Sequence, residues 1–381
     1  MPAIDGKTLD PAFTSNSAYN TTLNYVHLSH DASIPGYDYT FLNSQYPLPV
    51  HDDLETQVNK FLESKPPRNP PKETLWIFNF GFWDIWALSS MPREIAEVAI
   101  NRTVSDMFQQ IEILYKASLV ESSIAFSDFW GYSDPDIIEK LENNQLSDVR
   151  GEREMFRVLI PRVVDPSITP GWESMRPRPP SPHSLAVHMT NAAYLTERWN
   201  DAIWLQMDRW EKLPNPVPVE SIAAGSERAE ARKRDLGPSD WKRSAADIRD
   251  RENKQQQPGF DLEPLLAPFP RRQSMDFNGF NFVREVLIEG QFRGAGFTDM
   301  LGRGQRAMES LMYYDEAWRP CSEGDLDAKP RLFSQRTSSN ENGTCASPDN
   351  FFWDTPFLLG NKAAHTLARF AATEAAIRLS L

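Results

Sequence analysis

Apolar residues occur in two patterns along the chain, short continuous runs and long stretches with helical spacing. Thr74 to Phe80 and Phe156 to Val164 are short apolar runs bounded by proline, glycine or charged residues, which predicts two buried strands. Helical spacing starts at Pro92, extends again from Pro182 to Trp210, and returns near Gly360 until the end of the chain. Strands that alternate with long helices predict an α/β domain with a parallel sheet.

We therefore expect one domain over residues 1–381, a three-layer α/β/α sandwich with a mainly parallel sheet. One segment differs in composition, because residues 214–270 open with a proline-rich run and then become densely charged with few apolar positions. Two interpretations of this insertion remain open, a partner-binding arm or a solvated, partly disordered segment.

Composition excludes several classes of protein. A hydrophobic content of 40% excludes wholesale disorder, and the net charge of −13 disfavours binding to nucleic acid. The longest apolar runs, such as Leu75 to Phe82, fall far short of the roughly 20 residues that span a membrane. The two cysteines and six histidines show no metal-ligand spacing, so we expect neither metal nor cofactor. The oligomeric state is left open.

The segment Phe351 to His365 contains one candidate acid and one candidate base. Asp354 follows an aromatic run, a proline-containing turn comes next, and a helix is predicted from about Asn361. Side chains of a helix lean toward its amino end, so His365 would overhang the loop that carries Asp354. An acid that orients a base is the arrangement that activates a nucleophile in acyl transfer. The alternative is a structural histidine packed on a tryptophan.

A second cluster lies at Asn79 to Trp86, at the end of the first predicted strand. Gly81 would let the backbone approach a ligand, and its N–H could contribute to an oxyanion hole. Asp84 lies at the carboxyl end of a parallel strand, where α/β folds place their sites. If the two predicted strands are neighbours, we expect Gly81, Asp165 and Asp354 at the same edge of the sheet.

The other histidines have ordinary structural interpretations. His27 and His30, in the segment NYVHLSHDAS, are expected near a strand end and turn. His188 lies beside the apolar stripe of the long helix and is expected to be a satisfied core histidine rather than a base.

Several segments resemble fungal members of the SGNH/GDSL hydrolase superfamily, which includes secreted acetyl esterases that act on carbohydrates. The resemblance begins near Tyr19 and rests on these segments: Leu23 to Ile34, Gln57 to Phe61, Asn79 to Trp86, Ile160 to Pro170, Arg198 to Asn200 and Phe352 to Asp354.

This resemblance implies a flavodoxin-like fold and hydrolysis of an acylated carbohydrate or a small ester. Asp354 would orient the base, His365 would stand in as that base, and Gly81 would donate to the oxyanion. The family's Gly-Asp-Ser block is absent, Trp83 stands where the family has asparagine, and Phe357 stands where a histidine should follow Asp354.

Two histories would account for these departures. The start of the chain, with a secretory leader and the nucleophile, could be missing, which would make the protein extracellular; otherwise it would be cytoplasmic. Alternatively, catalysis has been lost and the domain serves as a non-catalytic carbohydrate- or partner-binding protein.

A disulfide between Cys321 and Cys345 is predicted, because both lie in polar, turn-rich chain. The resembled esterases are secreted, and a glycosylation sequon at Asn342 lies beside Cys345, with further sequons at Asn20 and Asn101. The alternative is a pair of reduced cytosolic cysteines.

Overall fold

The computed structural model describes residues 12–65, 73–119, 123–125, 155–214, 270–321 and 347–379. Almost all of the predicted charged insertion, 214–270, lies outside these residues. The described part is a mixed α/β structure with two small parallel sheets.

Long helices supply most of the regular structure. The elements follow one another in this order: α1 (Asn16–Ser29), η1 (Pro35–Tyr37), α2 (Leu42–Gln45), α3 (Leu54–Leu62), β1 (Leu75–Ile77), α4 (Phe82–Leu88), α5 (Arg93–Ser118), β2 (Met155–Pro161), η2 (Pro166–Ile168), α8 (Pro170–Met175), α9 (Leu185–Glu211), β3 (Arg271–Phe277), α12 (Phe280–Gly294), β4 (Glu316–Pro320), η3 (Pro348–Asn350), β5 (Phe351–Trp353) and α13 (Asn361–Arg378).

The main sheet has three parallel strands in the order β1-β2-β3. Its central strand β2 pairs with β1 from Leu75↔Arg157 and with β3 as far as Pro161↔Phe277. The two strands predicted from sequence are therefore parallel neighbours, although each is shorter than its apolar run. The strands β4 and β5 form a separate parallel pair.

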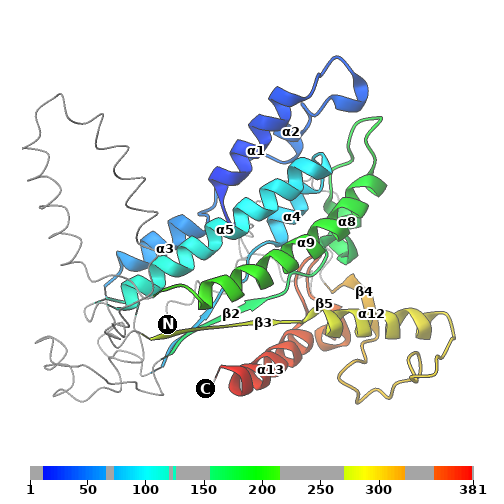
Figure 1. Cartoon of the computed structure of the whole chain (residues 1–381). Helices are drawn as coiled ribbons and strands as arrows, with labels where there is room; N and C mark the ends of the chain where they lie inside the picture. Colours follow the sequence, from blue (N-terminus) through cyan, green and yellow to red (C-terminus); the bar gives the residue numbers. More distant parts are fainter. Residues whose placement is uncertain are drawn as a thin grey trace, which may run out of the picture.

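Helices cover both faces of the main sheet. Figure 1 shows α5 and α9 on one face and α13 on the other. Successive side chains of a strand point to opposite faces, and β2 follows this rule. Phe156, Val158 and Ile160 join the core formed with α5 and α9, whereas Leu159 packs with Ala375 of α13. Burial on both faces explains why β2 is apolar at every position except Arg157.

The long helices confirm the helical spacing in the sequence. The α5 helix begins directly after Pro92, and α9 begins at the capping residue Ser184, whose hydroxyl accepts the N–H of Val187 at 3.2 Å. Trp199 of α9 is among the largest fully buried side chains. Within the described ranges, no helix is long and apolar enough to cross a bilayer.

The expectation for the amino-terminal histidines was wrong. His27 lies in the last turn of α1, and His30 caps its carboxyl end. Ser15 is the N-cap of α1, and its hydroxyl accepts the N–H of Ala18 at 3.2 Å. The apolar positions of α1 follow helical spacing rather than alternation, and they bury Ala18, Tyr19, Thr22, Leu23 and Val26.

Candidate functional site

Gly81 ends the connection from β1 and is the N-cap of α4, with a left-handed φ of 106°. A Cβ at this position would lie 2.4 Å from a ring carbon of Trp199. Gly81 is therefore required both by its backbone conformation and by the close approach of α9.

Asp84 lies in the first turn of α4 and is 2% exposed. Its carboxylate accepts the backbone N–H of Thr14 at 3.0 and 3.1 Å and the Thr14 hydroxyl at 2.8 Å. Burial raises the pKa of Asp84 to about 7, although the bonds from Thr14, from Asp84's own N–H and from the N–H of Gly81 act in the opposite direction. Asp84 thus fastens Thr14 to α4. The predicted contribution of the Gly81 N–H to an oxyanion hole stays a prediction.

The segment after β2 is fixed to α9 by a side-chain clamp. Asn200 accepts the N–H of Val163 at 2.9 Å and donates to the Val163 carbonyl at 3.1 Å. Asp165 follows as the cap of η2 and accepts the N–H of Ser167 at 2.8 Å, and burial raises the pKa of Asp165. Since β1 and β2 are parallel neighbours, Gly81 and Asp165 follow strand ends at the same edge of the sheet.

The loop that carries Asp354 is a tight turn between β5 and α13. The N–H of Asp354 donates to the carbonyl of Leu358 at 2.8 Å, and Trp353 forms an antiparallel bridge with Leu359. Phe357 lies within this turn. The N–H of Gly171 in α8 donates to the carbonyl of Pro356 at 2.9 Å, which holds the loop on α8.

The Phe357 ring is inserted among aromatic side chains of α4. Its centroid lies 5.9 Å from that of Phe82, 5.0 Å from Trp83 and 5.3 Å from Trp86, in edge-to-face orientations. On the α8 side, Gly171 leaves the room for this ring, because a Cβ there would lie 2.1 Å from it. The Asp354 loop therefore reaches α4, directly after Gly81, through an aromatic side chain.

His365 is exposed on α13, five residues after the N-cap Gly360, rather than in the first turn. Among the described residues His365 makes no hydrogen bond or ion pair, so the structure does not join it to Asp354. Its predicted role as a base, and that of Asp354 as its orienting acid, stay predictions.

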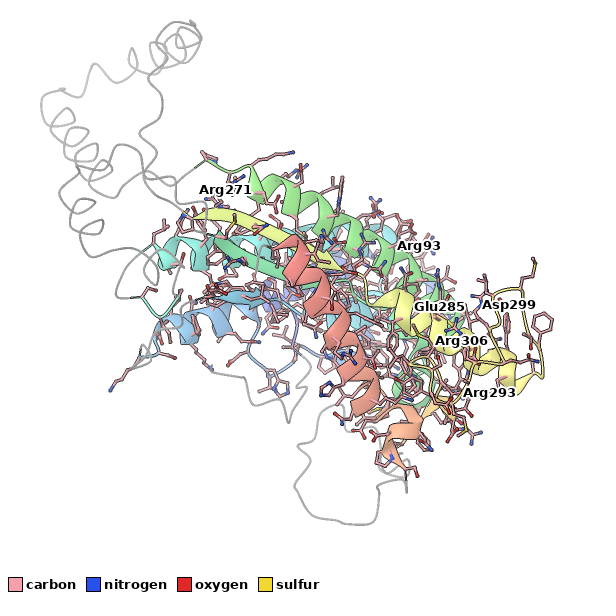
Figure 2. All side chains as sticks on the ribbon, turned by 90° about the horizontal axis from the view of Figure 1, so that it is seen from below. Arg93, Arg271, Glu285, Arg293, Asp299 and Arg306 are labelled. Carbon is pink, nitrogen blue, oxygen red and sulfur yellow. The ribbon has the colours of Figure 1, made fainter. Side chains whose placement is uncertain are left out.

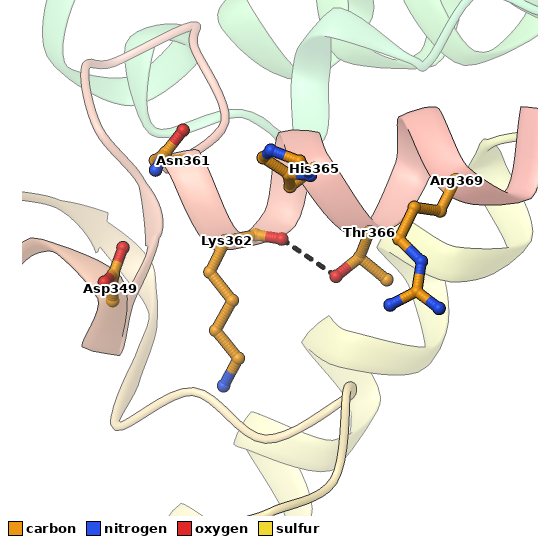
Figure 3. Close-up of a pocket in the computed structure, with 6 residues that line it drawn as sticks. All are labelled: Asp349, Asn361, Lys362, His365, Thr366 and Arg369. Carbon is orange, nitrogen blue, oxygen red and sulfur yellow. Dashed lines mark hydrogen bonds between the residues drawn. The ribbon is translucent and has the colours of Figure 1, made fainter.

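His365 instead lines a shallow pocket of about 290 Å³ at the start of α13 (Figure 3). The pocket is formed by one face of α13 and by η3, from Asp349, Asn361, Lys362, His365, Thr366 and Arg369. Three of these side chains carry basic nitrogen, and Gly360 caps the helix without a side-chain hydrogen bond. Such a helix start is an environment that favours anions.

Lys362 is the most firmly held of the basic side chains. Its ammonium donates to the carbonyl of Tyr313 at 3.0 Å and lies 4.7 Å from the centre of the Tyr314 ring. Thr366 donates to the backbone carbonyl of Lys362 at 2.8 Å (Figure 3). The i, i+4 and i+7 spacing of Lys362, Thr366 and Arg369 would have revealed this face once the helix was predicted.

A buried cation lies outside both clusters. The guanidinium of Arg176 is 3.9 Å from the centre of the Trp172 ring and donates to the carbonyl of Trp86 at 2.7 Å and to the hydroxyl of Ser89 at 2.8 Å. Burial lowers the pKa of Arg176 to about 10. Neighbouring His188 is buried as predicted, and burial lowers its pKa to about 3, so its ring is neutral. Both side chains stabilise the packing between helices.

Cys321 follows β4, and its N–H donates to the carbonyl of Trp353 in β5 at 2.8 Å. Cys321 is disulfide-bonded rather than a free thiol. The predicted partner Cys345 lies outside the described residues, so the pairing stays a prediction. Across the described ranges, no group of three His, Cys, Asp or Glu side chains could hold a metal ion.

Comparisons with known proteins gave no match among family models, curated proteins or solved structures.

Proposed function

We propose that this protein acts by binding rather than by catalysis, on a flavodoxin-like domain related to the SGNH hydrolases. The contact between Trp83 and Phe357, with ring centroids 5.0 Å apart, carries the proposal. These are the two positions at which the resembled family has its catalytic asparagine and histidine. Here they form one aromatic contact that occupies the space between α4 and the Asp354 loop.

The side chains of the pocket on α13 are the groups that would bind the ligand. Lys362, His365 and Arg369 present donors for an anionic group, and Asn361 and Asp349 offer hydrogen bonds to hydroxyls. An acidic carbohydrate, which carries one carboxylate among several hydroxyls, combines both requirements. The proposed ligand is therefore a uronic acid residue or a glycan that contains one.

The experiment is a calorimetric titration of the full chain with D-glucuronate, with D-glucose as the neutral control. Glucuronate should bind and glucose should not. Arg369→Glu should weaken glucuronate binding at least tenfold, about 1.4 kcal/mol, because it reverses a charge on the pocket.

The matched control is Arg102→Glu, which reverses an exposed charge on α5, away from the pocket, and should leave binding unchanged. If both variants weakened glucuronate binding equally, the effect of Arg369→Glu would be explained by long-range electrostatics alone. Absence of glucuronate binding would contradict the proposed ligand.

Ester hydrolysis is the second candidate function, with an acylated carbohydrate or a small ester as substrate. It is favoured by one observation, the exposure of His365 on a pocket that begins directly after the Asp354 loop.

We further propose that the protein is secreted, as the resembled esterases are. Two of the sequon asparagines, Asn20 on α1 and Asn101 on α5, are exposed and would accept a glycan. A mass increase removed by a glycosidase, measured on protein expressed in a secreting eukaryotic host, would support this proposal.

A further inference from the structure

The guanidinium of Arg176 is a buried positive charge whose hydrogen-bond acceptors are all neutral. Arg176 is 5% exposed, and it donates to the carbonyl of Trp86 at 2.7 Å and to the hydroxyl of Ser89 at 2.8 Å. Its third polar neighbour is Nδ1 of His188 at 3.4 Å, and burial lowers the pKa of that ring to about 3, so it is neutral as well. In the part of the chain that the structure describes, no carboxylate forms an ion pair with Arg176.

Other arginines with little exposure are paired with carboxylates. The side chain of Arg272 is 3% exposed, and its guanidinium lies 3.0 Å from the carboxylate of Glu112. Arg306, which is less buried, reaches Glu285 of α12 at 3.2 Å (Figure 2). A buried arginine without an anionic partner is rare, because removal of a charge from water is costly unless an opposite charge replaces it. Arg176 is such an exception.

Two buried donors at this place lack a hydrogen bond of ordinary geometry within the described residues. They are Nε of Arg176 and the hydroxyl of Tyr46, a residue that is 3% exposed. The central carbon of the guanidinium lies 5.1 Å from the centre of the Tyr46 ring. Burial raises the pKa of Tyr46, and the neighbouring charge of Arg176 acts in the opposite direction. An N–H and an O–H without acceptors, beside a cation, are the donors that an anion requires.

The other surroundings of Arg176 offset its burial only in part. The central carbon of its guanidinium lies 3.9 Å from the centre of the Trp172 ring and 4.9 Å from that of the Trp86 ring. These cation–π contacts are attractive but bring no negative charge. The carbonyl of Trp86 belongs to the last turn of α4, and a helix end carries about half a charge at most. A full counter-charge is therefore still required.

We propose that Arg176 and Tyr46 bind a chloride ion in the core, held by Nε of the guanidinium and by the tyrosine hydroxyl. One monovalent anion neutralises one guanidinium and accepts both donors. Chloride is spherical, so it accepts hydrogen bonds from two elements without a fixed orientation. A sulfate or phosphate carries more charge and more oxygens than this one cation and its donors would satisfy. The chloride site shares no residue with the pocket on α13 and does not depend on the proposed function.

The test is urea denaturation of the full chain at constant ionic strength, with sodium chloride replaced stepwise by sodium methanesulfonate, whose anion is much larger. A ligand that binds only the folded state raises the folding equilibrium constant in proportion to its concentration once the site is nearly full. Above the dissociation constant, each tenfold rise in chloride should increase this constant about tenfold, which is 1.4 kcal/mol.

Tyr46→Phe removes one donor of the proposed site and nothing else. In methanesulfonate the variant should be at least as stable as the wild type, because it lacks a buried hydroxyl without a partner. In chloride the wild type should become the more stable protein, since the variant should bind the ion about tenfold more weakly. Tyr25→Phe, at an exposed position of α1, and Arg369→Glu, in the pocket on α13, should keep the wild-type dependence on chloride.

Three results would overturn the proposal. A wild-type midpoint that does not change with chloride would mean that water, rather than an anion, accepts the two donors. The same chloride dependence in the wild type and in Tyr46→Phe would place the ion elsewhere. Loss of this dependence in Arg369→Glu would assign chloride to the pocket on α13.

Discussion

Replacement of Gly81 by alanine is expected to destabilise the protein by roughly 2 to 5 kcal/mol. A left-handed backbone costs about 1–2 kcal/mol for a residue with a Cβ, and overpacking of a core costs about 1–3 kcal/mol. Both terms apply, because φ is 106° and the new Cβ would lie 2.4 Å from the ring of Trp199. Trp199 is 1% exposed and has little room to move. Urea denaturation should show a clearly lower midpoint.

Gly36→Ala is the matched control for this substitution. A Cβ at Gly36 would meet nothing within 4 Å, and its φ is not positive. The control should change the free energy of unfolding by no more than about 0.5 kcal/mol. Equal midpoints for the two variants would show that α9 does not approach Gly81 as closely as described.

Stability should fall as the pH rises through neutrality because of Asp84. The pKa of its carboxyl is near 3.8 in the unfolded chain and about 7 in the folded protein. The folded state therefore holds the proton more tightly, so the stabilisation is complete below about pH 4 and is lost as the pH rises through 7. Between pH 5 and 7 the free energy of unfolding should decrease by about 2 kcal/mol from this group.

Asp84→Asn removes the titrating group. It should therefore remove this part of the pH dependence of the free energy of unfolding, regardless of how stable the variant is. Asp208→Asn, at an exposed position of α9, should keep the wild-type slope. Urea denaturation of the three proteins at several pH values measures the difference. Parallel slopes for wild type and Asp84→Asn would mean that Asp84 is ionised throughout this range.

The elements that were predictable from sequence are those stabilised by their own apolar pattern. The helices α5, α9 and α13 show sustained helical spacing, and β2 is apolar at every position except Arg157. Strand β3 was not predicted, because its sequence RRQSMDF is mostly polar and depends on distant partners. Arg272 of β3 lies 4.0 Å from the centre of the Tyr115 ring and bonds Glu112 at 3.0 Å, both on α5.

The candidate site was only partly predictable for a similar reason. The sequence located the two segments that meet, at Gly81 and at Asp354, because strand ends and turns mark both. It did not show that Phe357 would fill the space between them, since this depends on Gly171 in a third segment. Nor did it distinguish the buried, structural carboxyl of Asp84 from a functional one, because burial depends on Thr14, 70 positions earlier in the chain.

The most direct test of binding without catalysis is the hydrolysis of p-nitrophenyl acetate by the full chain. If the contact between Trp83 and Phe357 closes the site, wild type and His365→Ala should both hydrolyse the ester no faster than a non-catalytic protein of similar surface. Turnover by the wild type that is abolished in His365→Ala and in Asp354→Asn, with unchanged unfolding midpoints, would contradict the account and establish ester hydrolysis as the function.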